Sequence, residues 1–171
     1  MKSRFALFLV VLSMFCVRHA YAAEEIQECL AYPAKIIELL EKVEGELPVV
    51  PEANNNELTS LYHDHGLPNF YKYKNKPFFY LWLLRTEIGA VKKNAQSMAG
   101  SEGMGLALAP SGFLSLHISN ARVAWAEYAR SSSDEALTES KKEEVSMNLF
   151  AASGFFSLYL SCLAQHLKSD P

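Results

Sequence analysis

The chain has 171 residues, of which half are hydrophobic and a fifth are charged, with 16 basic against 19 acidic residues. A chain with this much apolar material is expected to fold rather than to stay disordered. Its length suits one domain with a substantial core. The net charge of −3 argues against nucleic-acid binding through the overall electrostatic field of the protein.

The first 22 residues have the features of a signal peptide. Lys2 and Arg4 make the start positive, residues 5–17 are apolar, and residues 20–22 form an Ala-x-Ala cleavage site. We therefore expect cleavage near the end of that site, an exported protein that is periplasmic or secreted, and a mature single helical domain of residues 23–171. Three basic residues and no acidic one are lost with the leader, so the net charge falls from −3 to −6.

Apolar residues recur at steps of three and four along most of the mature chain, which predicts helices. No strand pattern is evident, so the sequence predicts an all-α fold, an up-down bundle of about four helices. A proline- and asparagine-rich segment, residues 47–77, is predicted to be one long irregular loop, with room for a short helix near 57–62. The predicted helices cover residues 24–44, 77–98, 110–130 and 132–168.

The last of these helices is the most apolar part of the mature chain. Residues 145–167 carry no formal charge, and apolar side chains surround most of the helix. Such a helix lies either at the centre of a bundle or in a membrane, so a membrane-associated protein is one alternative, although the polar residues within the segment make a membrane span the weaker reading. Ser153, Ser157 and Ser161 form a row of small residues that predicts a close helix contact.

Two cysteines remain after removal of the leader, and an exported protein with two cysteines is expected to form one disulfide. Cys29 lies near the start of the first predicted helix and Cys162 near the end of the last. In an up-down bundle of four helices these two ends are neighbours. The sequence therefore predicts a Cys29–Cys162 disulfide.

His63, Asp64 and His65 form the best candidate metal site in the chain. In an extended segment the two histidines project to the same side, and imidazole binds zinc or copper. A solvated turn explains the same residues, and the sequence does not identify a third and a fourth ligand. A metal- or small-ligand-binding helical protein that uses His63 and His65 is therefore an alternative function.

Aromatic and basic residues alternate between residues 70 and 76, in the one concentrated positive patch of an acidic chain. Such a patch can bind an acidic protein, anionic lipid headgroups, sugars or bases. The same pattern arises when aromatic rings pack under a loop and lysines extend to water. The candidate partner-binding residues are Tyr71, Lys72, Tyr73, Lys74 and Lys76.

No nucleophile, base and orienting group can be placed together from the sequence, and no cofactor motif is found. The sequence favours a protein without enzymatic activity or cofactor. Our main hypothesis is a small exported helical bundle that binds a protein partner in the cell envelope, as an inhibitor, an immunity protein or an accessory factor.

Overall fold

The computed structural model describes residues 28–99, 104–132 and 137–168, so the predicted signal peptide lies outside the described residues. Within these ranges the secondary structure is helical and includes no strand. The predicted all-α class is therefore confirmed. The described helices are residues 28–46, α2 (Glu52–Phe70), the 3₁₀ helix η1 (Tyr71–Tyr73), α3 (Phe79–Ala99), α4 (Met104–Ser131) and α5 (Glu139–Lys168).

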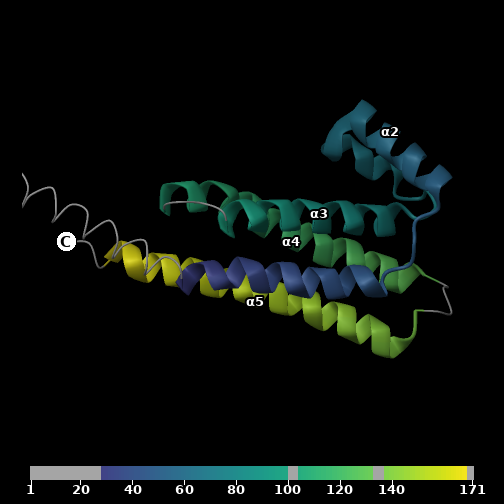
Figure 1. Ribbon diagram of the computed structural model, residues 1–171. Coiled ribbons are helices and arrows are strands. Elements are labelled where there is room, and N and C mark those ends of the chain that lie inside the picture. Colours follow the sequence, from purple (N-terminus) through teal and green to yellow (C-terminus); the bar gives the residue numbers. More distant parts are fainter. Residues whose placement is uncertain (1–27, 100–103, 133–136, 169–171) are drawn as a thin grey trace, which may run out of the picture.

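Four long helices, 28–46, α3, α4 and α5, run roughly along one direction, and α2 lies at one end of them (Figure 1). Each long helix points in the direction opposite to the one before it in the chain (Figure 1). The end that carries α2 also holds the starts of α3 and α5 and the end of α4. We call this end the α2 end, and the opposite end, where Cys29 and Cys162 lie, the disulfide end.

The predicted long irregular loop over residues 47–77 is wrong, because most of this segment is helical in α2 and η1. Asparagine, histidine and aspartate are weak helix formers, so the residue composition of this segment did not indicate a helix. Its support comes from the tertiary structure: Leu58 and Phe70 are fully buried, and the Phe70 ring packs 5.0 Å from that of Trp82. Gly66 interrupts α2 with a φ of 66°, a conformation that glycine adopts without steric cost.

Two predicted helix starts also differ from the structure. α4 begins at Met104 rather than at Pro110, because the intervening leucines and alanines are strong helix formers. α5 begins at Glu139 rather than at residue 132. Thr138 caps it, since its Oγ1 accepts a hydrogen bond of 3.3 Å from the Lys141 backbone N–H.

The stripes predicted for the long helices form the core. On α5 the buried residues follow the predicted steps of three and four, and on α3 and α4 the same spacing is buried. Trp125 of α4 donates its indole N–H to Ser146 of α5 at 2.8 Å. The buried stripe of α5 consists of Val145, Leu149, Ala152, Phe156, Tyr159 and Leu163.

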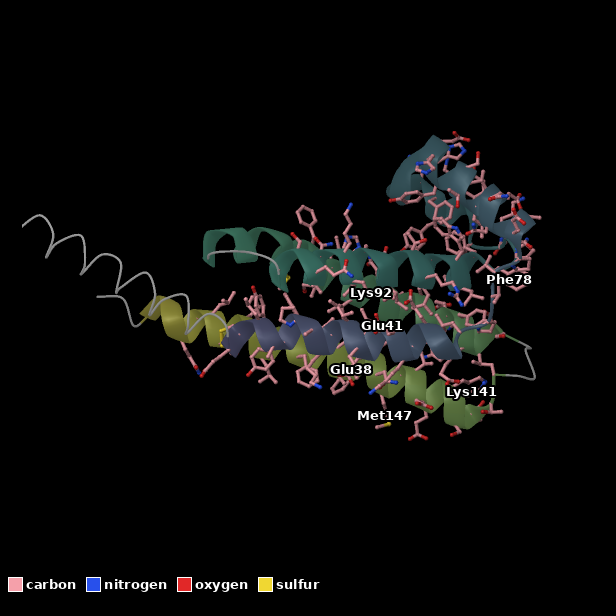
Figure 2. The ribbon with its side chains drawn as sticks, in the orientation of Figure 1. Glu38, Glu41, Phe78, Lys92, Lys141 and Met147 are labelled. Atoms are coloured by element: carbon pink, nitrogen blue, oxygen red, sulfur yellow. A yellow bond between two sulfur atoms is a disulfide. The ribbon has the colours of Figure 1, made fainter. Side chains whose placement is uncertain are left out.

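Only one face of α5 is buried, which corrects the expectation that the helix is surrounded by apolar neighbours. Phe150 is 67% exposed and Met147 is 65% exposed, and Met147 points away from the bundle (Figure 2). The predicted close contact of the serine row is also wrong, because Ser157 and Ser161 are exposed. The Ser157 hydroxyl instead donates to the backbone carbonyl of Ser153 at 3.2 Å, as helical serines do.

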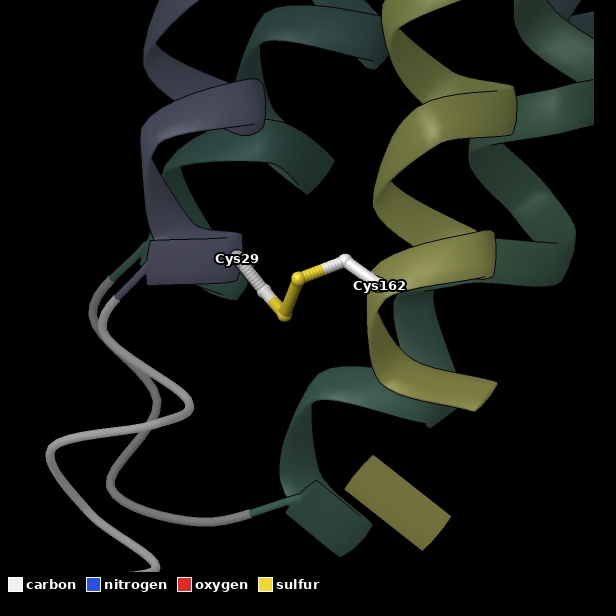
Figure 3. The surroundings of a disulfide bond; sticks show 2 residues. All are labelled: Cys29 and Cys162. Carbon is white, nitrogen blue, oxygen red and sulfur yellow. A yellow bond between two sulfur atoms is a disulfide. The ribbon is translucent and has the colours of Figure 1, made fainter. Parts of the chain in front are cut away.

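A disulfide joins helix 28–46 to α5 at the disulfide end, as predicted (Figure 3). The Cα atoms of Cys29 and Cys162 are 5.7 Å apart, within the usual range for a disulfide. The bond links positions 133 residues apart in the chain. A cysteine pair joined in this way is consistent with an oxidising compartment.

Polar contacts tie helix 28–46 and the segment after it to α3. The Lys92 ammonium lies 2.7 Å from the Glu44 carboxylate and faces helix 28–46 (Figure 2). Nearer the α2 end, the Arg85 guanidinium donates to the carbonyl oxygen of Leu47 at 2.9 Å and to that of Pro48 at 2.8 Å. These bonds satisfy backbone carbonyl groups of the segment that follows helix 28–46.

A candidate partner-binding groove at the α2 end

A tight connection of five residues, 74–78, leads from η1 into α3. The Lys74 N–H donates to the Tyr71 carbonyl at 3.3 Å, and the Lys76 N–H donates to the Tyr73 carbonyl at 2.8 Å. These two turns direct consecutive polar side chains outward, and residues 74–78 are all exposed. The connection therefore presents its side chains to solvent although its backbone is fixed by hydrogen bonds.

Phe78 ends this connection in an unusual backbone conformation. Its φ of 60° is the one positive value among the non-glycine residues that the structure describes. Its carbonyl accepts the first helical hydrogen bond of α3, from the Trp82 N–H at 2.8 Å. A bulky residue in this region costs roughly 1–3 kcal/mol, yet the side chain is 39% exposed and stands at the start of α3 (Figure 2).

An open groove of about 700 Å³ lies between this connection and the end of α4. Its lining brings together two segments separated by about fifty residues in the sequence. Aromatic rings form part of the wall, and cationic side chains come from both segments. The lining residues are Lys74, Asn75, Lys76, Pro77, Phe78, Phe79, Tyr80, Glu127, Tyr128, Arg130, Ser131 and Ser132.

The cations of the groove differ in their partners. The Lys76 ammonium lies 2.6 Å from the Glu57 carboxylate of α2, and Arg130 pairs with Glu127 one turn earlier on α4. All of these charged side chains are at least partly exposed, so the ion pairs contribute little stability and can exchange partners. An incoming carboxylate can therefore replace Glu57 or Glu127.

The predicted partner-binding residues divide into two groups. Lys74 and Lys76 line the groove, whereas Tyr71, Lys72 and Tyr73 do not. Tyr73 packs inward, with its ring 6.3 Å from Phe70. The pKa of Tyr71 is raised above its ordinary value, most strongly by burial, next by the Glu87 carboxylate and least by Tyr80. This phenol therefore stays neutral at physiological pH.

His63 and His65 lie on α2, which overturns the extended geometry on which the predicted metal site rested. Residues two apart on a helix are about 200° apart around its axis, so the two imidazoles do not converge. His65 Nε2 is 2.8 Å from the Tyr73 hydroxyl, and Asp64 accepts a hydrogen bond from Ser60 at 3.4 Å. Among the described residues no cluster of three or more metal-binding side chains is found.

Sequence reasoning missed a buried polar cluster between α3 and α4. Glu87 is 3% exposed. Its carboxylate is 2.5 Å from His117 Nδ1 and accepts a hydrogen bond of 3.3 Å from the Asn120 amide. The available signal was a glutamate within the apolar stripe of α3, next to Ile88. The cluster joins the two helices and leaves the carboxylate fully paired.

No protein-family model, curated protein or solved structure matches this chain. The geometry of the groove and of the surrounding surface is therefore the basis for assigning a function.

Proposed function

We propose that the protein is an exported up-down bundle of four long helices that binds an acidic segment of a protein partner in the cell envelope. The groove at the α2 end is the proposed binding site. Lys74, Lys76 and Arg130 would pair with carboxylates of the partner, and Phe78 and Tyr80 would pack against its apolar side chains.

The observation that carries this proposal is the exposed, strained Phe78 at the edge of a groove with cations on both sides. Phe78 has a φ of 60° and is 39% exposed, so part of its side chain is free to contact a partner. Strained residues persist where the surrounding structure fixes them, and they concentrate at binding sites. An aromatic anchor surrounded by cations fits the usual composition of protein interfaces, which are enriched in aromatic residues and arginine.

Export is supported by two independent features. The first 22 residues have the pattern of a signal peptide, and the Cys29–Cys162 disulfide fits an oxidising compartment. A partner in the envelope follows from this location. The role of the complex, as inhibition, immunity or assistance, depends on the identity of the partner.

Site-specific photo-crosslinking in the producing cells tests the proposal. A benzophenone amino acid replaces Asn75 in the groove, and in a second strain it replaces Lys93, which is exposed on α3 but does not line the groove. We expect a discrete crosslinked protein from position 75 and none from position 93. Mass spectrometry of the adduct identifies the partner.

A charge-reversal variant separates groove binding from chance proximity. Lys74→Glu with Arg130→Glu should abolish the adduct at position 75, because both substitutions place a like charge against the partner's carboxylates. Lys93→Glu is the matched control and should leave the adduct unchanged. An adduct that survives the double reversal, or equal adducts from positions 75 and 93, would refute the proposed site.

A further inference from the structure

The outer surface of the α4–α5 pair exposes large apolar side chains, which we call the α4–α5 face. α5 is the one helix in the described part of the chain that is long and apolar enough to cross a membrane, yet only 28% of its most apolar window is buried. Single exposed apolar residues are ordinary, but a continuous group indicates an interaction surface. The face comprises Leu116, Val123, Met147, Phe150 and Leu158, each between 50% and 67% exposed.

These residues lie on one side of the helix pair. Leu116 and Val123 are seven residues apart on α4, and Met147, Phe150 and Leu158 follow steps of three and eight on α5, so each set projects from one side of its helix. The Arg122 guanidinium lies over the Phe150 ring, 5.5 Å from its centre. This contact joins the two sets across the boundary between the helices.

The face carries both a ridge and a groove. Met147 and Phe150 protrude, and beside them a groove of about 630 Å³ runs between α4 and α5. The groove is lined largely by small or apolar residues, including Ala126, Ala129 and Ala151. A surface that holds protruding and recessed apolar features side by side can be complementary to a second copy of itself, as two-fold symmetric interfaces require.

The charge distribution along α5 allows two copies to pair without placing their charged turns against each other. The charged residues of α5 up to position 167 all precede Val145. When two copies of α5 pair in opposite directions, as two-fold symmetry across this face allows, the charged first turns of one copy lie beside the uncharged half of the other. Gly154, where an added Cβ would meet no atom within 4 Å, would let the two helices approach closely.

The exposed side chains supply a large part of the area that a dimer needs. An aromatic side chain such as Phe150 buries roughly 150–250 Å², and the four other side chains of the face bury less. Burial of all five in both copies, together with the small residues between them, approaches the roughly 1,000 Å² of a specific interface.

We infer that the α4–α5 face binds a second copy of this chain and forms a two-fold symmetric dimer. The proposed partner groove at the α2 end is lined by other residues, although α4 contributes side chains to both surfaces. The inference does not depend on the proposed function of that groove.

Sedimentation equilibrium of the exported, disulfide-bonded protein tests the inference. We expect a monomer–dimer equilibrium with the dimer dominant at micromolar concentration. Phe150→Glu and Leu158→Glu should each weaken dimerisation at least tenfold, because each buries a charge at the interface. Val49→Glu is the matched control: Val49 is 81% exposed outside this face, and its substitution should leave the dimer unchanged.

Oxidative crosslinking supplies a measurement that does not depend on dimer strength. Gly154→Cys should give a covalent dimer under mild oxidation, and Val49→Cys should not. Three results would each overturn the inference: a monomer at all concentrations, a dimer unaffected by Phe150→Glu and Leu158→Glu, or binding of the monomer to phosphatidylcholine vesicles that these two substitutions abolish. The last result would assign the face to lipid.

Discussion

The two ends of the helix bundle are held together in different ways. At the α2 end, Arg85 donates three hydrogen bonds to the carbonyl groups of Leu47 and Pro48. The Lys141 ammonium also lies 3.4 Å from the Glu46 carboxylate there. At the disulfide end, one covalent bond joins helix 28–46 to α5, and the buried Tyr159 hydroxyl of α5 has no hydrogen-bond partner among the described residues.

This difference fits the surfaces that the two ends present. The hydrogen bonds from Arg85 fix the backbone geometry of Leu47 and Pro48 at the α2 end, because hydrogen bonds are directional. The disulfide constrains the distance between two helices and acts mainly on the unfolded chain. Directional hydrogen bonds therefore hold the chain after helix 28–46 at the α2 end, and a covalent constraint holds the same helix at the disulfide end.

Removal of the disulfide should have the largest effect on stability. In the chain-entropy model, a bond that closes a loop of this length contributes on the order of 4–5 kcal/mol, which is comparable with the total stability of many domains. We expect the Cys29→Ala/Cys162→Ala variant to lose most of that free energy of unfolding, measured by urea titration.

Hydrogen exchange would show where the disulfide acts. The amides near Cys29 should lose protection first in the double variant, and those of α3 near Arg85 last. A loss of under about 1 kcal/mol, or uniform loss of protection along the chain, would contradict the assignment of this bond as the main constraint at its end.

Arg85→Met tests the α2 end and should have the second largest effect. Methionine keeps much of the aliphatic length of arginine but leaves the Leu47 and Pro48 carbonyls without their donor. Hydrogen bonds from a charged donor contribute about 1.5–3 kcal/mol, so we expect a loss of about 2 kcal/mol with faster amide exchange in α2. Lys35→Met, at an exposed ion pair with Glu38, is the control and should change stability by under about 0.5 kcal/mol.

Tyr159→Phe should have the smallest effect and the opposite sign. The substitution keeps the ring and removes a buried hydroxyl that has no partner in the part of the chain that the structure describes, so we expect a gain of up to about 1 kcal/mol. Thermal unfolding of the variant at neutral pH measures it. A destabilised variant would show that the hydroxyl has a partner in solution, such as a bound water molecule.

Alkaline pH should enlarge the effect of Tyr159→Phe. Burial raises the pKa of Tyr159 above the ordinary value of 10.0, so the folded protein holds this phenol neutral when the unfolded chain already ionises it. The stability linked to the neutral phenol is complete below pH 10 and is lost as the pH rises through the raised pKa. The stability of the wild type should therefore fall more steeply than that of the variant above pH 10.

The sequence predicted those parts of the fold that leave a regular pattern along the chain. The buried apolar stripe of α5 could be predicted because its residues recur every three or four positions. The disulfide could be predicted from the number of cysteines and the order of the helices. α2 could not be predicted, because the packing of Leu58 and Phe70 on α3 stabilises it rather than the helix propensity of its residues. The start of α5 was predicted at residue 132, whereas the helix begins at Glu139 and Thr138 caps it, because serine and threonine both suit a helix cap.

The candidate groove was only half predictable. Lys74 and Lys76 were named from a local cluster of basic and aromatic residues, whereas Arg130 and Tyr128 join them through the packing of α3 on α4. No sequence signal gave the positive φ of Phe78, because this region is rare for a bulky residue. The apolar residues of α5 were visible in the sequence, but their division into a buried and an exposed side required the positions of the neighbouring helices.

The Glu87, His117 and Asn120 cluster has a consequence for how α3 and α4 pair. Apolar contacts are not directional, so they specify the relative position of two helices less strictly than a polar contact does. A buried carboxylate does not tolerate a shift of one helix along the other, because the shift would leave the Glu87 charge unpaired in the core. The cluster therefore fixes the register of α3 against α4. Substitution at position 87 should be accepted in evolution only together with a change at position 117 or 120.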